Sequence, residues 1–524
     1  MDDKLREEIN RRRTFAIISH PDAGKTTLTE KFLLFGGAIN TAGSVKGKAN
    51  SKYAVSDWMD IEKERGISVT SSVLQFNYDG YCINILDTPG HQDFSEDTYR
   101  TLMAADSAVM VIDASKGVEA QTIKLFKVCV MRHIPIFTFI NKMDRDARDT
   151  FELLDDIETV LGIKTCPVNW PIGSGKEFKG VYDRKTKIVS TFQAISTGGA
   201  KKAEETDYHI DDEALKELVG PYLFDQFNEE IELIDGATEE MDIEKVRAGE
   251  LSPVFFGSAL NTFGIEQFLN YFLKMTTPPI GRNSSEGIID PVTEPFSAFV
   301  FKIQANMNKA HRDRIAFMRI CSGKFEAGME VYHAASKRKI KLSQPQQLMA
   351  QDRKIVDEAY AGDVIGVFDP DLFSIGDTLT TGGKKFEYEG IPTFAPEHFC
   401  RKRKQFVKGV TQIAQEGAIQ IFQEYTAGLS EIIVGVVGVL QFDVLKYRLE
   451  NEYGCEIRLE PIPYNYIRWV KDPTIDVTKL KRVSDVKKVK DMKGNPLLLF
   501  ANEWVIDQVL QHNEGLELEE FRKN

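Results

Sequence analysis

The segment TFAIISHPDAGKT, residues 14–26, carries the strongest structural signal in the first part of the chain. Its first six residues are mostly apolar, which is typical of a buried strand, and Leu28 and Phe32 follow at the i, i+4 spacing of a helix. Between them, Ser19–Thr26 matches the pattern G-x-x-x-x-G-K-[ST], with serine in place of the first glycine. Because N–H groups at a helix N-terminus can hold phosphate oxygens, the sequence predicts a phosphate-binding loop.

Two side chains of this loop have predicted roles. Lys25 should reach the β- and γ-phosphates of a nucleotide, and the Thr26 hydroxyl should hold Mg²⁺. Asp22 has two open interpretations: it helps to hold a monovalent cation near the phosphates, or it caps a turn. The residues of this segment predicted to contact the nucleotide are Ser19, His20, Pro21, Asp22, Ala23, Gly24, Lys25, Thr26 and Thr27.

A second motif, DTPGH, follows the β-rich run Tyr81–Asp87. A carboxylate at the end of a strand can hold magnesium through water, which is the role predicted for Asp87. Gly90 can donate its backbone N–H to the γ-phosphate. The predicted contact residues here are Asp87, Thr88, Pro89, Gly90 and His91.

A third motif, NKMD at 141–144, ends another predicted strand and is predicted to select the base. The Asp144 carboxylate can accept both N1–H and the exocyclic amine of guanine, whereas adenine would leave it unpaired. After the next strand, the segment Gly257-Ser-Ala259 can offer a backbone N–H to guanine O6. The predicted base-binding residues are Asn141, Lys142, Met143, Asp144, Ser258, Ala259 and Leu260. These motifs, in this order and each at the end of a strand, predict a GTP site that also binds GDP.

The segment RGISVT, residues 65–70, lies between the phosphate loop and DTPGH, where a GTPase has its first switch. A hydroxyl there would complete the Mg²⁺ coordination only in the presence of the γ-phosphate, so the nucleotide state would order or release this segment. Ser68 is the predicted ligand, and Thr70 is the alternative. The predicted metal ligands are thus Thr26, Ser68 and, through water, Asp87.

His91 is the predicted catalytic residue. A GTPase needs a group that orients the attacking water, since most of its catalysis is positioning and electrostatics. The alternative is a histidine that belongs passively to the loop.

Alternating strands and helices predict a doubly wound α/β domain, and Asp79-Gly80 predicts a tight hairpin within it. The expected strands are 14–19, 73–78, 81–87, 107–113, 134–140 and 253–258, and the expected helices include 119–132, 147–161 and 264–275. Thr276–Pro291 is rich in Pro, Gly and Ser and is predicted to be a linker. Short β runs with Gly and Asp turns then predict a β-barrel, followed by a small α/β sandwich that is hard to assign beyond Lys471.

The predicted fold is therefore a multidomain α/β protein. Its predicted domains are a phosphate-loop GTPase domain over 1–280 with an insert at about 145–257, a β-barrel domain over 292–383 and a C-terminal α/β domain over 384–524.

Composition limits the class of protein. With 42% apolar and 28% charged residues the chain is typical of globular proteins, and the charged start MDDKLREEINRRR does not fit a secretory signal. Six scattered cysteines form no C-x-x-C pair, which indicates a reducing compartment, so we expect a cytoplasmic protein without membrane contact. The net charge of −13 disfavours general nucleic-acid coating, but basic runs at Lys337–Lys341, Arg401–Lys404 and Lys479–Lys493 could face RNA or be solvated.

The motifs resemble those of the translational GTPases and, among these, the bacterial peptide chain release factor 3 family. The similar segments are SHPDAGKTTLTEK from Ser19, SDWMDIEKERGISVTSSVLQF from Ser56, DTPGHQDFSEDTYRTL from Asp87, NKMDRDARD from Asn141 and IIVGVVGVLQFDV from Ile432. A histidine directly after D-T-P-G is the translational variant of the water-orienting group. Ser68 departs from the family pattern R-G-I-T-I, where a threonine stands.

This resemblance implies an elongation factor G-like architecture of GTPase domain, barrel domain and third α/β domain. It also implies a monomer that binds the ribosome, through ribosomal RNA and proteins, and removes class-I release factors after peptide release, with no DNA partner. Two alternatives are another ribosomal task, such as translocation or target protection, and a GTP-gated binding module that does not hydrolyse GTP. Relatives with other tasks generally carry further C-terminal domains, for which the chain after the linker is too short.

Overall fold

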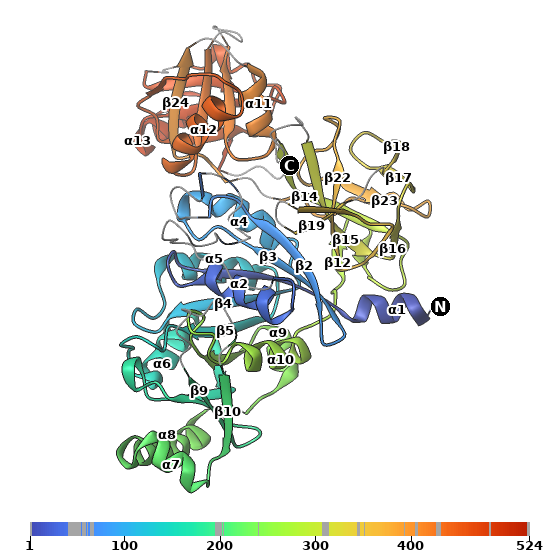
Figure 1. Cartoon of the computed structure of the whole chain (residues 1–524). Coiled ribbons are helices and arrows are strands. Elements are labelled where there is room, and N and C mark those ends of the chain that lie inside the picture. Colours follow the sequence, from blue (N-terminus) through green and yellow to red (C-terminus); the bar gives the residue numbers. More distant parts are fainter. Residues whose placement is uncertain are drawn as a thin grey trace.

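The computed structural model describes residues 3–39, 54, 59, 61–62, 68–193, 202, 204–238, 240–305, 314–342, 346–349, 352–391, 394–403, 407–425, 431–481 and 484–520. Three large sheets follow one another along the chain. Figure 1 shows the domain of the third sheet above that of the first, and the β-rich domain of the second beside them.

The first sheet has seven strands in the order β2-β3-β1-β4-β5-β11-β6. Only β2 and β3 pair antiparallel, and the other pairings are parallel. The strands are β1 (Arg12–Ser19), β2 (Ser72–Tyr78), β3 (Tyr81–Asp87), β4 (Ser107–Asp113), β5 (Ile136–Asn141), β6 (Lys164–Pro167) and β11 (Leu251–Phe256). The β2–β3 turn has positive φ angles at Asp79 (47°) and Gly80 (80°), as a tight hairpin requires.

Helices cover both faces of this sheet, because alternate residues of β1 pack into apolar clusters on opposite faces. Phe15 and Ile17 belong to the apolar cluster that includes side chains of α2 and α10, whereas Ala16 and Ile18 belong to the cluster of α5 and α6. The helices are α2 (Lys25–Phe35), α4 (Ser95–Leu102), α5 (Ala120–Met131), α6 (Thr150–Leu161) and α10 (Ile265–Met275). The predicted doubly wound domain is confirmed.

One helix begins later than predicted. The expected helix at 147–161 starts at Thr150, because the Asp149 carboxylate accepts the N–H groups of Phe151 and Glu152 and so caps the first turn.

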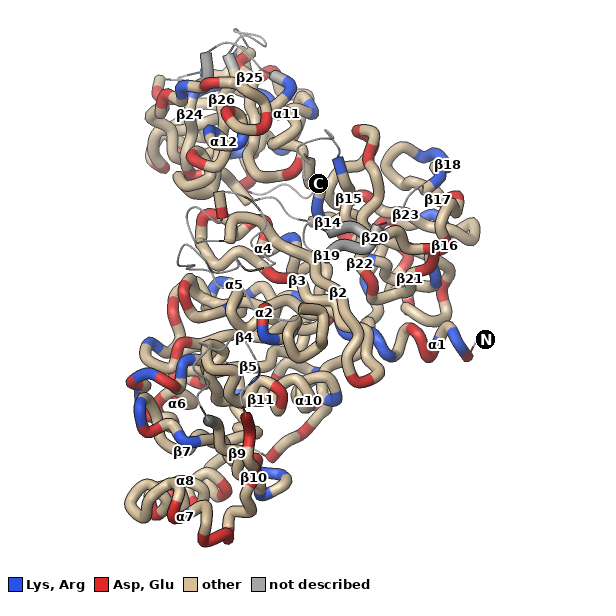
Figure 2. Tube along the Cα trace, in the orientation of Figure 1, with Lys and Arg blue, Asp and Glu red and all other residues tan. Residues whose placement is uncertain are grey.

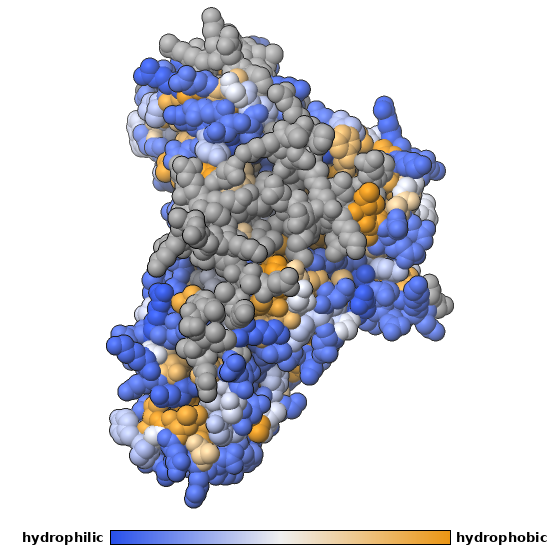
Figure 3. Space-filling view, in the orientation of Figure 1, coloured by the Kyte–Doolittle hydropathy of each residue, from blue (hydrophilic) through white to orange (hydrophobic). Residues whose placement is uncertain are grey.

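The range 145–257 is only partly outside the first sheet. Within it β6 pairs with β11 and β11 with β5, so both strands belong to the first sheet, and β6 forms its edge. The physical reason is that the backbone groups of these largely buried strands need hydrogen-bond partners. The rest forms a four-stranded antiparallel sheet with helices, in which the expected hairpin at 180–192 is β8–β9. Its elements are β7 (Asn169–Ile172), β8 (Gly180–Asp183), β9 (Ile188–Gln193), β10 (Glu204–His209), α7 (Glu213–Val219), α8 (Pro221–Ala237) and α9 (Ile243–Ala248). In Figure 3 apolar side chains gather over α7 and α8, where Leu218, Tyr222 and Leu233 are exposed.

The expected linker contains a short hairpin, β12 (Arg282–Ser284) with β13 (Gly287–Ile289). After it, eight strands form an antiparallel sheet in the order β18-β17-β23-β14-β15-β22-β19-β20, around an apolar core of their own. The strands are β14 (Ser297–Ala305), β15 (Arg314–Ser322), β17 (Glu330–His333), β18 (Arg338–Lys341), β19 (Gln346–Met349), β20 (Asp352–Ile355), β22 (Val364–Phe368) and β23 (Thr378–Thr380), with the pair β16 (Lys324–Glu326) and β21 (Glu358–Tyr360) beside them. The first helix, α1 (Asp3–Asn10), places the buried Ile9 in the same core. This is the predicted barrel domain.

The C-terminal domain is one eight-stranded sheet in the order β27-β24-β26-β25-β29-β30-β28-β31, with helices packed on it. The residues beyond Lys471, which carried no clear pattern, extend this sheet. Its elements are β24 (His398–Arg403), α11 (Val407–Gln415), β25 (Gln420–Glu424), β26 (Glu431–Val436), α12 (Leu440–Asn451), β27 (Leu459–Pro461), β28 (Tyr466–Val470), β29 (Val486–Lys490), β30 (Pro496–Phe500), α13 (Glu503–His512) and β31 (Leu518–Glu519).

Buried charges join the barrel domain to the first domain. Arg12 donates to Asp363 at 2.7 Å, and Lys302 donates to the backbone oxygen of Ser71 at 2.5 Å. In the described part of the chain, no helix is long and apolar enough to cross a bilayer.

Candidate nucleotide-binding site

The predicted phosphate loop lies between β1 and α2, as its sequence indicates. Asp22 and Gly24 have positive φ angles of 65° and 98°. A Cβ atom built on Gly24 would collide with the Asn141 amide, which itself donates to the backbone oxygen of Ala23 at 2.8 Å. Only glycine fits at position 24, because both the backbone angle and the space exclude a side chain.

Lys25 and Asp87 meet where β1 and β3 end. The Lys25 ammonium donates to Asp87 Oδ1 at 2.6 Å, and both groups are buried. Thr29 Oγ1 donates to the same oxygen at 3.2 Å. The group predicted for the phosphates and the carboxylate predicted for magnesium thus lie at one point, at the carboxyl ends of parallel strands, where open α/β sheets bind their ligands.

The two hydroxyls predicted to hold magnesium lie close together. Thr26 Oγ1 and Ser68 Oγ are 3.3 Å apart. Thr70, the alternative ligand, instead donates its N–H and its hydroxyl to Glu62 Oε1, at 3.1 and 3.4 Å. Residues 65–67 of this segment lie outside the described residues.

This donor set fits Mg²⁺. The described residues contain no group of three or more His, Cys, Asp and Glu side chains placed for a metal. Magnesium in nucleotide sites is held by few protein groups, with phosphate oxygens and waters completing its coordination. The two hydroxyls, 3.3 Å apart, and the strand-end carboxylate of Asp87 are oxygen donors of the kind that this ion prefers.

On the base side, the loops after β5 and β11 are tied together. Asp144 Oδ1 accepts the Ser258 hydroxyl at 2.5 Å, and Asn141 Oδ1 accepts the Ala259 N–H at 2.8 Å. The N–H groups of Gly257 and Ser258 donate to Ile140 and Phe263. A bond from Ala259 to guanine O6 would therefore have to replace its bond to Asn141.

Lys142 crosses from the base loop to the phosphate loop. Its ammonium donates to the Asp22 backbone oxygen at 2.5 Å and to Asp113 Oδ2 at 2.7 Å. Burial tends to raise the pKa of Asp113, but the hydrogen bonds from Lys142 and Ser115 lower it below its usual value. The Asp22 side chain is exposed, so its two interpretations stay open.

Asp113 was not among the predicted site residues, although it ends a predicted strand as Asp87 does and so carried the same signal. The remaining predicted residues surround this core. His20 Nε2 lies 3.4 Å from Glu119, the Thr88 hydroxyl donates to Ile17, the Met143 N–H donates to Gly257, and Leu260 is exposed. Thr98 donates to the backbone oxygen of Pro89, Gly90 lies against Pro21, and Thr27 is half-buried in the first turn of α2.

His91 begins the short 3₁₀ helix η1 (Gln92–Phe94). Its Nδ1 accepts the Asp93 N–H at 3.3 Å and lies 3.3 Å from Asp93 Oδ1, and 37% of the side chain is exposed. The ring packs edge-on against Phe94 at 6.2 Å. The Nδ1 edge faces Asp93, so the Nε2 edge is the one that can meet a water molecule.

Three family models match successive parts of the chain. The elongation factor Tu GTP binding domain matches residues 10–278, the elongation factor G domain 2 matches 295–382, and the C-terminal domain of class II release factor RF3 matches 388–510. A crystal structure of a protein from Thermus thermophilus superposes with a TM-score of 0.67 at 22% identity, covering 92% of this chain and 72% of that one, and shows the likeness of fold.

Relatives of known family cover nearly the whole chain. A peptide chain release factor 3 from Symbiobacterium thermophilum is 56% identical over 98% of each chain. Another from Synechococcus elongatus is 53% identical over 98% of this chain and 94% of its own. The resemblance drawn from the motifs is thereby confirmed. The chain belongs to the peptide chain release factor 3 family and carries the GTPase domain of that family.

Proposed function

We propose that this chain is a ribosome-dependent GTPase that acts in translation termination and drives class-I release factors off the ribosome after peptide release. The observation that carries the nucleotide site is the convergence of four loops at one edge of the first sheet. They are linked by the bonds Lys25–Asp87, Asn141–Ala23 and Asp144–Ser258.

Each of these residues has a distinct task in the proposed reaction. Lys25 exchanges its bond with Asp87 for the β- and γ-phosphates, and Asp144 receives guanine. His91 orients the water that attacks the γ-phosphate, with its Nε2 edge directed to that water. Because a GTPase gains most from positioning and electrostatics, each residue contributes by fixing one partner in place.

We also propose that Thr26, Ser68 and, through water, Asp87 hold Mg²⁺. The ion supplies charge that stabilises the phosphate oxygens in the transition state. The 3.3 Å separation of the two hydroxyls favours Ser68 over Thr70. Ser68→Ala should thus weaken the effect of Mg²⁺ on GTP hydrolysis more than Thr70→Ala.

The test of this function is the recycling of a class-I release factor on terminated ribosomes, with and without this protein and GTP. We propose that the protein works as a cytoplasmic monomer, so the rate of recycling should rise in proportion to the concentration of the monomeric protein. Release-factor turnover that needs both the protein and GTP would support the proposal. Turnover unchanged by the protein would contradict it, even if GTP were hydrolysed.

The strand β18 is a candidate contact for ribosomal RNA. Figure 2 shows its basic residues at the outer edge of the barrel domain. Of the basic side chains in Lys337–Lys341, Lys339 pairs with Glu330 at 3.2 Å. In the other predicted run, Arg401 pairs with Glu424, and Lys404 lies outside the described residues.

We expect a variant with Arg338→Glu and Lys341→Glu to bind ribosomes with a weaker salt dependence and to keep its GTP affinity. Each lost phosphate contact should flatten the slope of log affinity against log salt by about 0.7 to 0.9. A matched control is Lys384, which lies just after the barrel domain and pairs with Glu294 at 2.6 Å. If the variant and Lys384→Glu show the same slope as the parent chain, β18 is a solvated surface.

A further inference from the structure

The segment after His91 is fastened to the C-terminal domain at two points. Asp93 Oδ2 accepts the N–H of Leu440, the first residue of α12, at 2.7 Å. The Arg100 guanidinium donates to the backbone oxygens of Glu416 and Gly417, at 3.4 and 3.1 Å, just past the end of α11. Asp93 and Arg100 are both buried.

Both contacts match the polarity of the helices that they meet. The first N–H groups of a helix lack partners within it, and the N-terminus of α12 has no side-chain cap from its own domain. Asp93 provides a carboxylate there, and Arg100 provides a cation at the opposite kind of helix end. Asp93 and Arg100, which lie close together in the GTPase domain, thus bind the N-terminus of α12 and the C-terminal end of α11.

Hydrogen bonds of Gln441 connect the two helix ends within the C-terminal domain. Gln441 Oε1 accepts the N–H groups of Val437 and Gly438, at 2.9 and 3.0 Å, and its Nε2 donates to the Ala418 backbone oxygen at 2.8 Å. A shift of the C-terminal domain therefore moves the partners of Asp93 and Arg100 together.

Two glycines allow this close approach. A Cβ atom on Gly438 would collide with the Asp93 carboxylate, and one on Gly417 would collide with the Arg100 guanidinium. Gly417 has a positive φ of 75°, whereas Gly438 has none. The space, and not the backbone angle, therefore excludes a side chain at Gly438.

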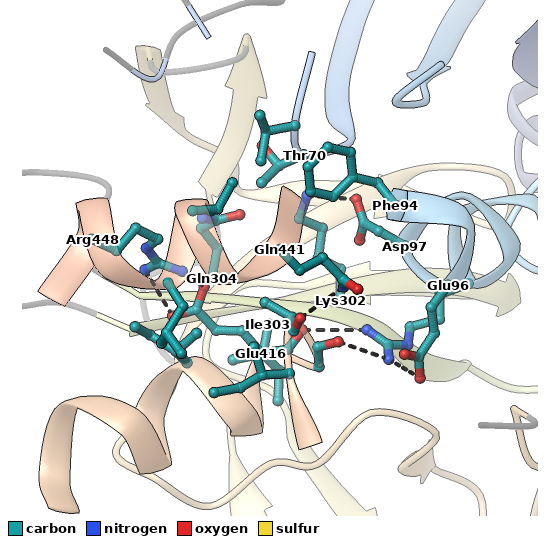
Figure 4. Close-up of a pocket in the computed structure, with 18 of the residues that line it drawn as sticks. Thr70, Phe94, Glu96, Asp97, Lys302, Ile303, Gln304, Glu416, Gln441 and Arg448 are labelled. Atoms are coloured by element: carbon teal, nitrogen blue, oxygen red, sulfur yellow. Dashed lines mark hydrogen bonds and ion pairs between the residues drawn. The ribbon is translucent and has the colours of Figure 1, made fainter. Parts of the chain in front are cut away.

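Apolar packing reinforces the same contact. Phe94 is buried in a cluster with Val444 of α12, with Met59 and Ile61, which precede the predicted first switch, and with Val69, which lies within it. Beside it lies a cavity of about 50 Å³, lined by the GTPase, barrel and C-terminal domains. Figure 4 shows Phe94 and Asp97 of the GTPase domain and Gln441 of the C-terminal domain among the residues that line this cavity.

Asp93 thus connects α12 with His91. One carboxylate oxygen accepts the Leu440 N–H, and the other lies 3.3 Å from His91 Nδ1. In the tautomer with its proton on Nδ1, the imidazole donates to this carboxylate instead of accepting the Asp93 N–H. Its Nε2 then points in a fixed direction, an arrangement that recurs where histidine acts on a reacting group.

We propose that Asp93 is a positioning residue through which the docked C-terminal domain orients His91 toward the attacking water. This inference rests on the catalytic role proposed for His91. When α12 lies against η1, the Asp93 carboxylate is fixed and directs the imidazole. When the C-terminal domain moves away, the carboxylate loses its bond to Leu440 and the ring loses its fixed orientation.

The first test removes the carboxylate. Asp93→Ala should lower the ribosome-stimulated kcat for GTP hydrolysis by about 10- to 100-fold, the scale of a misplaced catalytic group. Its GTP affinity and the ribosome concentration for half-maximal rate should stay unchanged, because the only predicted nucleotide residue that Asp93 is described as contacting is His91, whose proposed role is in hydrolysis. Asp93→Asn keeps an acceptor for the Leu440 N–H and should recover part of the rate.

The second test acts from the other domain. Gly438→Ala pushes on Asp93 without changing the GTPase domain, and it should lower kcat in the same way. Gly236→Ala, in α8, is the matched control, since a Cβ atom there meets no atom within 4 Å, and it should leave kcat unchanged. Thermal unfolding of each variant checks that the chain stays folded.

A double-variant cycle separates positioning from mere structural support. In the His91→Ala background, Asp93→Ala should cause no further loss of kcat, because it acts through His91. A full additional loss, or wild-type rates in both Asp93→Ala and Gly438→Ala, would overturn the inference while leaving the catalytic role of His91 intact. A wild-type rate in His91→Ala alone would instead overturn that catalytic role.

Discussion

His91→Ala is expected to bind GTP with nearly unchanged affinity and to lose about 10²- to 10⁴-fold of ribosome-stimulated hydrolysis, the usual contribution of a positioned proton-transfer group. The side chain lies just past Gly90, and its Nδ1 contacts Asp93 and not the predicted phosphate residues. An interaction formed only in the activated arrangement lowers the barrier without strengthening ground-state binding. Single-turnover hydrolysis on ribosomes, measured beside nucleotide affinity, checks this result.

Lys25→Ala provides the contrast. The buried ammonium pairs with Asp87, and its removal takes away the predicted phosphate contact and leaves a buried carboxylate without this partner. We expect this variant to lose nucleotide binding itself. If His91→Ala hydrolyses GTP on ribosomes at the wild-type rate, or binds GTP as poorly as Lys25→Ala, His91 has a structural role.

Asp144→Asn is expected to lower GTP affinity by about 100-fold or more and to raise the affinity for XTP. The carboxylate accepts two guanine donors, and an amide in its place matches xanthine, which offers an acceptor there. Losing paired donors in a buried site costs on the order of 3 kcal/mol. The Ser258 hydroxyl, 2.5 Å from Asp144 Oδ1, holds the carboxylate in place for this contact.

Competition binding with GTP, XTP and ATP checks the prediction. Asp155→Asn is a matched control. Asp155 is exposed on α6, so this substitution makes the same change of charge outside the predicted base loops. The wild-type chain should prefer GTP strongly over ATP. Equal binding of the two by the wild-type chain, or no gain for XTP in Asp144→Asn, would remove Asp144 from base recognition.

Much of the first domain follows from local sequence because its signals are local. The apolar runs of β1, β4 and β5 are typical of buried parallel strands, and Asp79-Gly80 is a strong signal for the tight turn between β2 and β3. The loops that follow such strands must lie at one edge of the sheet. Therefore the sequence alone allowed one site to be predicted from Lys25, Asp87, Asn141 and Asp144.

Long-range contacts were not accessible in this way. Asp113 was overlooked because its place in the site depends on the hydrogen bond from Lys142, which lies 29 positions later in the chain. The membership of β6 in the first sheet depends on pairing with β11, across the whole insert. Residues beyond Lys471 form strands because β25 and β30 pair with β29, although VKKVK by itself has no strong apolar alternation.

The sequence alone indicated the order of the domains and the loops that we predict to hold the phosphates and the base. It left Ser68 and Thr70 as two candidate magnesium ligands. Only the tertiary structure brought the Ser68 hydroxyl to Thr26 and turned Thr70 to Glu62. It alone brought α12 onto Asp93, 347 residues away in the chain. The physical reason is that a motif records what a short segment can bind, whereas the direction of a side chain depends on partners that folding delivers from other domains.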